Sequence, residues 1–306
     1  MTGRYIFRRV LASLLTLFII ITITFFMMRA IPGGPFTDEK AIPQFVLEKI
    51  MQRYHLNDPL YVQYGRYLLN VLCLDLGPSY RYEGMSVNEL IANSFPVSFE
   101  VGAIALSLAL LIGIPAGIIS ALRRGKWQDR LTMILSVLGV TVPNFVIAAA
   151  LVYVFSWQLG WVTVGFWEGI STAILPAITL AGYPAAFISR LVRSSMLEIL
   201  GQDYIRTAYS KGLSERVVIY IHALKNAIIP LITYLGPLTA GILTGSFVVE
   251  QIYGVPGLGT FFVTSITNRD YTTIMGVTIF YSAILVSFNL LADVLLVFID
   301  PRIKLK

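Results

Sequence analysis

Long apolar stretches alternate along the chain with shorter polar stretches. Six apolar runs are each long enough to cross a bilayer, and we expect helices at 10–28, 101–122, 131–157, 171–189, 226–249 and 271–299. At about 1.5 Å of rise per residue, an uncharged helix of about 20 residues spans the roughly 30 Å hydrocarbon core. The pattern therefore predicts an all-α polytopic membrane protein with six transmembrane helices.

The apolar runs divide the chain into three parts. Residues 1–29 hold a basic N-terminal segment and the first span, Val10–Met28. A cleaved signal peptide is the alternative, but its apolar region is usually only about 7–15 residues long and a small-residue cleavage site follows it. Residues 30–95 are proline-rich and mixed in charge, which favours a small extramembrane insert. Residues 96–306 form the transmembrane core.

Composition and charge agree with a membrane location. Hydrophobic residues make up 56% of the 306 residues and charged residues only 13%, against about 25% in soluble domains. With six spans, 16 of the 23 Lys and Arg residues lie on the side that holds both termini. The positive-inside rule places that side in the cytoplasm and the 30–95 insert outside. The single cysteine, Cys73, excludes an intrachain disulfide.

The segment Asp203–Lys225 is well charged and interrupts the apolar core. Its first half ends at Gly212, a predicted helix stop, and its second half places Val217, Val218, Ile221 and Leu224 on one side. The spacing indicates two short amphipathic helices at the cytoplasmic surface.

The chain contains no glycine-rich phosphate loop, so an active transporter of this sequence needs an external motor. The first amphipathic helix has the composition of a docking element, with Tyr204, Ile205 and Ala208 near one face and Arg206 and Lys211 at its rim. A solvated interfacial helix without a partner is the alternative.

Few polar groups fall within or beside the apolar runs. Acids there are functional hypotheses by default, and they are Glu100 and Glu250, at outer span ends where water reaches them, and Asp293, near an inner end. Each is either a path or gate residue or a group satisfied by its surroundings; for Asp293 the partner would be a cytoplasmic arginine. Asn144, beside Pro143, either lines a path or bonds between helices. Gly113 and Gly117 form a G-x-x-x-G pair that favours close helix packing.

The amphipathic segment resembles the cytoplasmic EAA loop of ABC-importer membrane subunits. That loop reads E-A-A, three residues, Gly, nine residues, I-x-L-P, and falls here on Arg206-Thr207-Ala208, Gly212 and His222–Lys225. The departures match the peptide-transport branch, where D-Y-[IV]-R-T-A-x-x-K-G and a downstream H-A-L are usual. Further similarities to that branch lie at Pro32–Pro35, His55–Leu60, Asp75–Gly77, Ser86–Ile91, Glu250–Gly259 and Asp270-Tyr271.

The chain is thus similar to the B-type membrane subunit of oligopeptide and dipeptide importers, most of all the oligopeptide one. The resemblance implies the type I ABC importer transmembrane fold in a bacterial inner membrane, with no catalytic residue, metal or cofactor in this chain and no nucleic-acid partner. It implies a homologous C-type membrane subunit, two ATPase subunits that bind ATP and Mg, and a solute-binding protein that delivers peptide.

The resemblance also assigns site residues. A coupling helix at 198–212 would seat in an ATPase through Glu198, Asp203, Tyr204, Ile205, Arg206, Thr207, Ala208, Lys211 and Gly212. The insert and an outer loop would form the docking surface and gate, with Tyr253, Pro256, Gly257 and Gly259 in the loop. An ion-coupled secondary transporter using the three acids, or a non-transport membrane protein, are the rival interpretations. The substrate stays open among oligopeptides, dipeptides, nickel chelates and antimicrobial peptides.

Overall fold

The computed structural model describes residues 2–31, 44–82 and 84–299. Within these ranges the chain is helical and contains no strand, only an isolated bridge between Pro78 and Ser86. The N-terminal helices are α1 (Thr2–Ala30), α2 (Gln44–Arg53), α3 (Leu60–Leu72), α4 (Val87–Leu122), α5 (Trp127–Thr141), α6 (Asn144–Leu151) and the π-helix η1 (Val152–Gln158). They are followed by α7 (Ile170–Leu200), α8 (Asp203–Ser210), α9 (Glu215–Val217), the π-helix η2 (Val218–Ala223), α10 (Leu224–Ala227), α11 (Ile229–Leu243), α12 (Phe247–Tyr253), α13 (Leu258–Thr267) and α14 (Tyr271–Ile299).

Four helices are long and apolar enough to cross a membrane: α1, α4, α7 and α14. Two bent pairs of helices pass the same length and composition test only when taken together, one at 127–158 with a 103° bend and one at 215–243 with a 51° bend. The described residues therefore provide the six predicted crossings when each bent pair counts as one, and the sixth run coincides with α14.

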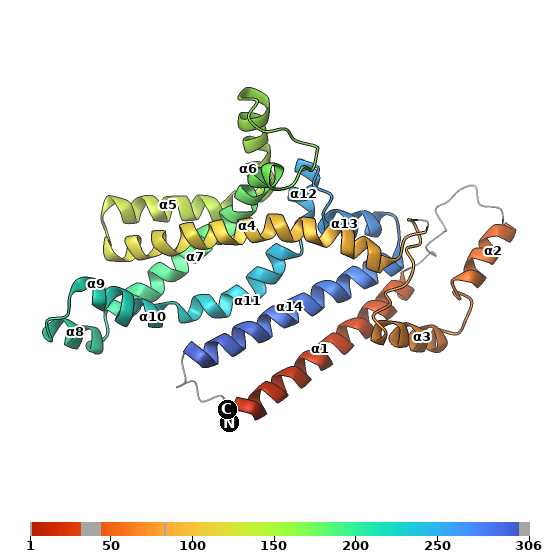
Figure 1. The fold of residues 1–306 in the computed structure, drawn as a ribbon, viewed down its shortest axis with the longest axis horizontal. Coiled ribbons are helices and arrows are strands. Elements are labelled where there is room, and N and C mark those ends of the chain that lie inside the picture. The colour runs from red at the N-terminus through yellow and green to blue at the C-terminus, as the bar shows by residue number, and fades with distance from the viewer. Residues whose placement is uncertain (1, 32–43, 83, 300–306) are drawn as a thin grey trace.

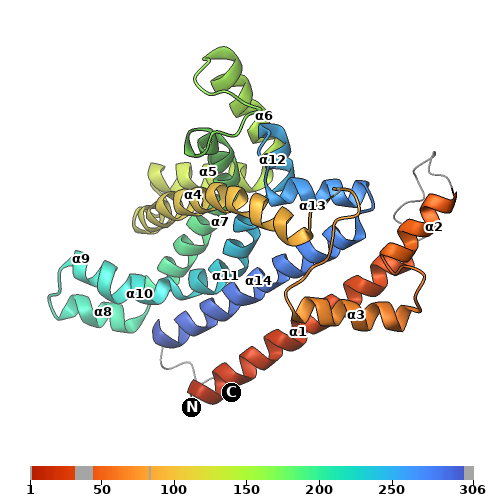
Figure 2. The ribbon, with the colours of Figure 1, turned by 45° about the vertical axis from the view of Figure 1, so that its right-hand side comes forward.

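The long helices α4 and α7 pack along each other at the centre of the molecule, and α1 lies at its edge beside α14 (Figures 1 and 2). Gly113 and Gly117 permit the central contact, because a Cβ at either position would lie within 2.9 Å of a backbone oxygen of α7. The G-x-x-x-G pair therefore serves helix packing in this fold.

The polar ends of the helices gather at one end of the molecule. In Figure 1 the end of α4, the start of α5, the end of α7 and α8 all lie toward the left, with the start of α1 and the end of α14 below them. An ion pair of 3.2 Å between Arg9 Nη1 and Asp293 Oδ2 joins the last two. The first and sixth spans are therefore antiparallel, as the six-span topology predicts.

Two predicted helices differ from the structure because strong local signals override the apolar pattern. The helix of the second span begins at Val87, inside the predicted 30–95 insert, where Ser86 and Glu89 form a capping box. The third span is broken rather than continuous over 131–157. Val142 is extended, with ψ of 120°, and Pro143 follows it. A residue before proline avoids helical geometry, so the chain turns sharply there.

Two other span ends also differ from the prediction. The fourth helix continues to Leu200, beyond the expected end at Ser189, despite Pro176 and Pro184 inside it. The fifth span ends at Leu243 rather than Val249, since Gly245 takes a left-handed φ of 96° and a new helix, α12, begins at Phe247. Glu250 therefore lies on α12 and not at the end of a continuous span.

Candidate functional site

The predicted coupling helix at 198–212 is divided in the structure. Glu198 belongs to the end of α7, the chain turns at Gly201 and Gln202, and α8 covers only Asp203–Ser210. Lys211 forms the C-cap, and Gly212 ends the helix with a left-handed φ of 78°, a conformation that glycine adopts without strain. The single helix expected over 198–212 is therefore wrong, while the stop at Gly212 is confirmed.

The two sides of α8 have different surroundings. Ile205, only 1% exposed, and Ala208 are buried against the protein's own core, in contact with η2. The opposite side carries exposed side chains of Arg206, Thr207 and Tyr209. The prediction that Ile205 and Ala208 belong to a docking face with Tyr204 is wrong for these two apolar residues, because they fix α8 to its own subunit.

The other predicted coupling residues are exposed. Tyr204 is partly exposed and its hydroxyl accepts a hydrogen bond of 2.9 Å from Asn226 Nδ2. Arg206 Nη1 lies 3.7 Å from Asp203 Oδ1, one turn away on the same helix, and both side chains are largely in solvent. Such an exposed pair contributes little to stability, so both charges are available to a partner.

The return segment differs in register from the prediction. Residues 218–223 form the π-helix η2, whose i→i+5 bonding turns each residue less than an α-helix does. Ile219 is consequently buried and Ile221 is exposed, although the α-helical pattern places Ile221 on the apolar side with Val218. The π-helix therefore changes which residues hold α8 in place.

At the opposite end of the molecule, Glu250 forms a buried polar centre. Its carboxylate accepts a 2.7 Å hydrogen bond from the Ser98 hydroxyl of α4 and a 2.8 Å bond from the Thr260 backbone N–H of α13. Ser98 Oγ in turn accepts from the Leu258 N–H at 2.8 Å. Glu250 is 3% exposed, so the expectation that water reaches it is wrong. A carboxylate at the first turn of α13 also suits the helix dipole.

Glycines enclose the Glu250 carboxylate. A Cβ on Gly257 would lie 2.4 Å from Glu250 Oε1, and a Cβ on Gly259 would lie 3.0 Å from Glu250 Oε2. Gly245 approaches the same carboxylate from the end of α11. The Glu–Pro-Gly-x-Gly spacing therefore has a physical basis, because only residues without side chains leave room for the acid.

The remaining residues of the outer loop and the second acid have different environments. Tyr253 is buried, and its hydroxyl shares a 2.8 Å hydrogen bond with Thr179 Oγ1 of α7. Pro256 is exposed at the turn. Glu100 is only partly buried and lies in the body of α4 instead of at a helix end. The structure brings Gly257, Gly259 and Glu250 together, directs the Tyr253 hydroxyl to α7, and leaves Glu100 apart.

Asn144 lies at the start of α6, directly after the break at Pro143. It lines an open hollow of about 320 Å³ with residues of α7 and α11, among them Tyr183, Tyr234 and Gly241. The rings of Phe187 and Tyr234 stack beside it, with centroids 4.3 Å apart. Asp293 is not part of this hollow, and its ion pair with Arg9 supports the structural role for that acid.

Comparison with known proteins covers nearly the whole chain. Residues 113–305 match the family described as binding-protein-dependent transport system inner membrane component, and residues 2–102 match the N-terminal family of the same membrane components. The chain is 46% identical over 303 residues to the oligopeptide transport system permease protein OppB of Haemophilus influenzae, covering 98% of this chain and 99% of that protein. The chain belongs to this permease family.

Other relatives agree with that assignment. The dipeptide transport system permease protein DppB of Bacillus subtilis is 46% identical over 303 residues, covering 99% of this chain and 98% of its own length. Among solved structures, the MetNI methionine ABC transporter in an inward-facing conformation matches with a TM-score of 0.54 at 16% identity, over 71% of this chain and 100% of that chain. This likeness shows the fold, that of a type I ABC importer transmembrane domain.

Membership decides between the rival interpretations. The chain is a multi-pass inner-membrane permease subunit of an ABC importer, and it is non-catalytic, because separate ATPase subunits hydrolyse ATP in this family. The family also implies ATPase and binding-protein partners. The ion-coupled secondary transporter is not supported.

One polar contact of this permease subunit was not predicted. Asp129 of α5 and Arg193 of α7 form a two-pronged ion pair, with Nε–Oδ1 and Nη2–Oδ2 distances of 2.7 and 3.0 Å. The Ser120 hydroxyl and the Gly125 N–H also bond to Asp129. The only sequence signal is that Asp129 is the one acid within the basic stretch 123–130. The pair joins α5 and α7, and Ser120 adds α4, close to the end of the subunit that carries α8.

A second unpredicted centre joins the insert to the last span. Asp270 is fully buried and accepts hydrogen bonds from the hydroxyls of Ser79 and Thr273 and from the Tyr80 N–H. Thr272, which replaces the proline of the D-Y-P pattern, donates its hydroxyl to Pro78 O at 2.7 Å. The outer end of the permease is thus held together by two buried acids, Asp270 and Glu250.

Proposed function

We propose that this chain is the pore-forming membrane subunit of an importer that takes up oligopeptides. The substrate class rests on relatives named for oligopeptide and dipeptide transport that are 46% identical over nearly the whole chain. The partners would be a homologous C-type membrane subunit, two ATPase subunits carrying ATP and Mg, and a solute-binding protein that delivers the peptide.

The observation that carries the proposal is the two-sided environment of α8. Its inner side is fixed to the subunit by Ile205 and Ala208, while Arg206, Thr207 and Tyr209 remain exposed. A helix that is rigidly attached on one side and polar-aromatic on the other is suited to a groove in a partner. We assign the coupling role to Asp203–Gly212, with Glu198 at the end of α7 as part of its support.

The hollow beside Asn144 and the loop closed by Glu250 are assigned to the path and the gate. Peptide would pass along the hollow beside Asn144, whose wall includes Tyr183 and Tyr234. The loop closed by Glu250, with Tyr253 and Pro256, would form the outer gate. Since α4 carries Ser98 of the gate and Ser120 of the Asp129 centre, one helix connects the two ends.

Reconstitution with the subunits that copurify tests the proposal. Uptake of a labelled tetra- or pentapeptide is expected to require ATP and to persist in the presence of an uncoupler. Uptake that collapses with the ion gradient while ATP is supplied would contradict it.

The coupling assignment has its own test. Arg206→Glu is expected to lower peptide uptake at least about tenfold while basal ATP hydrolysis continues, because a reversed charge at a seated helix costs several kcal/mol. Arg124→Glu is the matched control, since it makes the same charge change at an exposed position outside α8. Equal uptake by both variants and by the wild type would exclude α8 as the coupling helix.

A further inference from the structure

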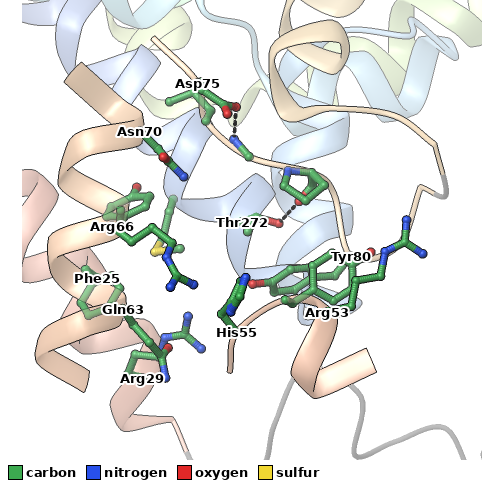
Figure 3. A pocket seen from close by; sticks show the side chains of 16 residues that line it. Phe25, Arg29, Arg53, His55, Gln63, Arg66, Asn70, Asp75, Tyr80 and Thr272 are labelled. Carbon is green, nitrogen blue, oxygen red and sulfur yellow. Dashed lines mark hydrogen bonds between the residues drawn. The ribbon is translucent and has the colours of Figure 1, made fainter. Parts of the chain in front are cut away.

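A cavity of about 190 Å³ lies at the outer end of the molecule, between the last turn of α1, α3, the segment 75–80 and α14. In Figure 3, Arg29 and Arg66 reach into it from α1 and α3, and His55 and Tyr80 face them. Burial raises the pKa of the Tyr80 phenol, and the charge and hydrogen bond of Arg29 oppose that shift. Arg29 therefore contacts Tyr80 at one side of the cavity.

Three polar atoms of the lining residues are buried and have no hydrogen-bond partner: Arg29 Nε, Gln63 Oε1 and the Tyr67 hydroxyl. Buried polar groups are normally satisfied, so these three atoms add unmet hydrogen-bonding capacity beside the cavity. Two of the three atoms can donate a hydrogen bond, which favours an occupant rich in acceptors.

The charge of the lining favours an anion. Three arginines line the cavity, Arg29, Arg53 and Arg66, against one acid, Asp75, whose carboxylate already accepts the Gly77 N–H at 2.9 Å. Arg66 shares its charge with Asp58 at 3.1 Å, whereas the Arg29 guanidinium lies over the Phe25 ring, 5.5 Å from its centroid, which leaves its charge for an anion. An arginine pair with nearby hydroxyl groups is suited to phosphate oxygens.

The depth of the cavity matches the lipid phosphates. Arg29 follows Arg9 by 20 residues on one helix, which is about 30 Å, the thickness of the hydrocarbon core. If Arg9 lies at one headgroup layer, Arg29 lies at the other. The Arg29 side chain, which is partly buried, therefore lies at the level of the outer lipid phosphates.

Apolar surface for acyl chains lies next to the cavity. Ile23, Phe26 and Met27 are exposed on the last turns of α1, and Tyr61, Leu69 and Leu72 are exposed on α3. The two helices are joined by a 2.7 Å hydrogen bond between Thr22 and Tyr64 and by stacking of Phe25 on Tyr67. The exposed side of α3 therefore continues the apolar surface of α1 at headgroup level, as in an interfacial helix.

We propose that this cavity binds the phosphate of an anionic phospholipid in the outer leaflet. The phosphodiester lies between the guanidinium groups of Arg29 and Arg66, beside the Tyr67 hydroxyl. The acyl chains cover the exposed apolar residues of α1 and α3. Basic pockets between helices at a membrane surface recognise headgroups in this way.

Native mass spectrometry of the delipidated full-length protein, titrated with phosphatidylglycerol, tests the site. Arg29→Gln is expected to weaken phosphatidylglycerol binding about tenfold, since one charge-assisted contact is lost. Tyr67→Phe, which keeps the charge and the packing, is expected to weaken it several-fold. The matched control is Lys49→Gln, which removes a positive charge from the same insert but does not line the cavity.

Thermal unfolding in zwitterionic detergent shows whether each variant is folded. If Arg29→Gln is misfolded, the phosphatidylglycerol affinity of Tyr67→Phe is the test of the site. Equal affinity of the wild type, Tyr67→Phe and Lys49→Gln would overturn the proposal. Displacement of the lipid by millimolar inorganic phosphate, or by a short acidic peptide, would also overturn it, because the site would then bind a soluble anion. Phosphatidylcholine binding as tightly as phosphatidylglycerol would remove the anionic selectivity.

Discussion

At the scale of single residues, the packing of the outer end of the subunit depends on three glycines as much as on the buried acid that they surround. The Glu250 carboxylate fits only because positions 245, 257 and 259 carry no side chain. Its two hydrogen bonds connect α12 with α4 and α13. The sequence places Glu250 in the outer loop, but its burial was not predicted, because the contact with Ser98, some 150 positions earlier in the chain, cannot be seen from local spacing.

Gly257→Ala is expected to lower the melting temperature by several degrees and to impair peptide uptake. The new Cβ would lie 2.4 Å from Glu250 Oε1, so the acid has to move and lose its hydrogen bonds. Differential scanning fluorimetry in detergent measures the stability. Gly65→Ala is the matched control: it lies within α3 with no atom within 4 Å of a Cβ, and alanine favours a helix over glycine. A Gly257→Ala protein as stable as Gly65→Ala would contradict the close packing described here.

The Asp129–Arg193 pair gives a second residue-scale prediction. Arg193→Gln leaves Asp129 buried without its charge partner, and breaking such a pair costs about 3 kcal/mol; Arg193 is partly exposed, so about 2 kcal/mol is expected. Arg190→Gln removes the same charge from an exposed position one turn earlier on α7 and should change little. Thermal unfolding of both variants distinguishes the pair from a general effect of charge, and equal melting temperatures would show that the pair is not structural.

At the scale of elements, the sequence predicted α14 and the stop of α8 at Gly212, since each depends on residues close together in the chain. Prediction from the sequence failed where contacts between distant parts of the chain determine the structure. The sequence predicts a continuous span through Val142–Pro143 because no charged residue lies around it. The spacing of α8 predicts a docking face on its apolar side, because an amphipathic pattern does not distinguish burial against the same subunit from burial against a partner.

Substitutions on the two sides of α8 test whether its apolar side holds the helix to its own subunit and its exposed side contacts a partner. Ile205→Ala removes a fully buried side chain and is expected to cost about 2–4 kcal/mol, with less protein in the membrane. Tyr209→Ala, on the exposed side, is expected to keep the melting temperature and to lower peptide uptake. Membrane abundance by immunoblot and uptake per molecule separate the two effects. Unchanged uptake per molecule in Tyr209→Ala would remove this residue from the coupling surface.

At the scale of the whole molecule, the two ends of the helix bundle differ in charge and in structure. One end carries the basic loops, α8 and the Asp129–Arg193 pair, and the other carries the insert, Glu250 and Asp270. The positive-inside rule predicts which end faces the cytoplasm, and the predicted six crossings agree with the two bent pairs. The similarity at Pro32–Pro35 and the basic C-terminal residues lie outside the described residues.

The single cysteine provides a direct test of this orientation. Cys73 is exposed at the end of α3, on the outer side of the predicted topology. In intact spheroplasts a membrane-impermeant maleimide should label it fully. In a Cys73→Ser background, Arg124→Cys places the thiol in the exposed loop between α4 and α5, where labelling should require permeabilisation. Because the two ends of one bundle cannot both face the same compartment, the reverse pattern would invert the topology, and with it the assignment of α8 to an ATPase and of the arginine cavity to the outer leaflet.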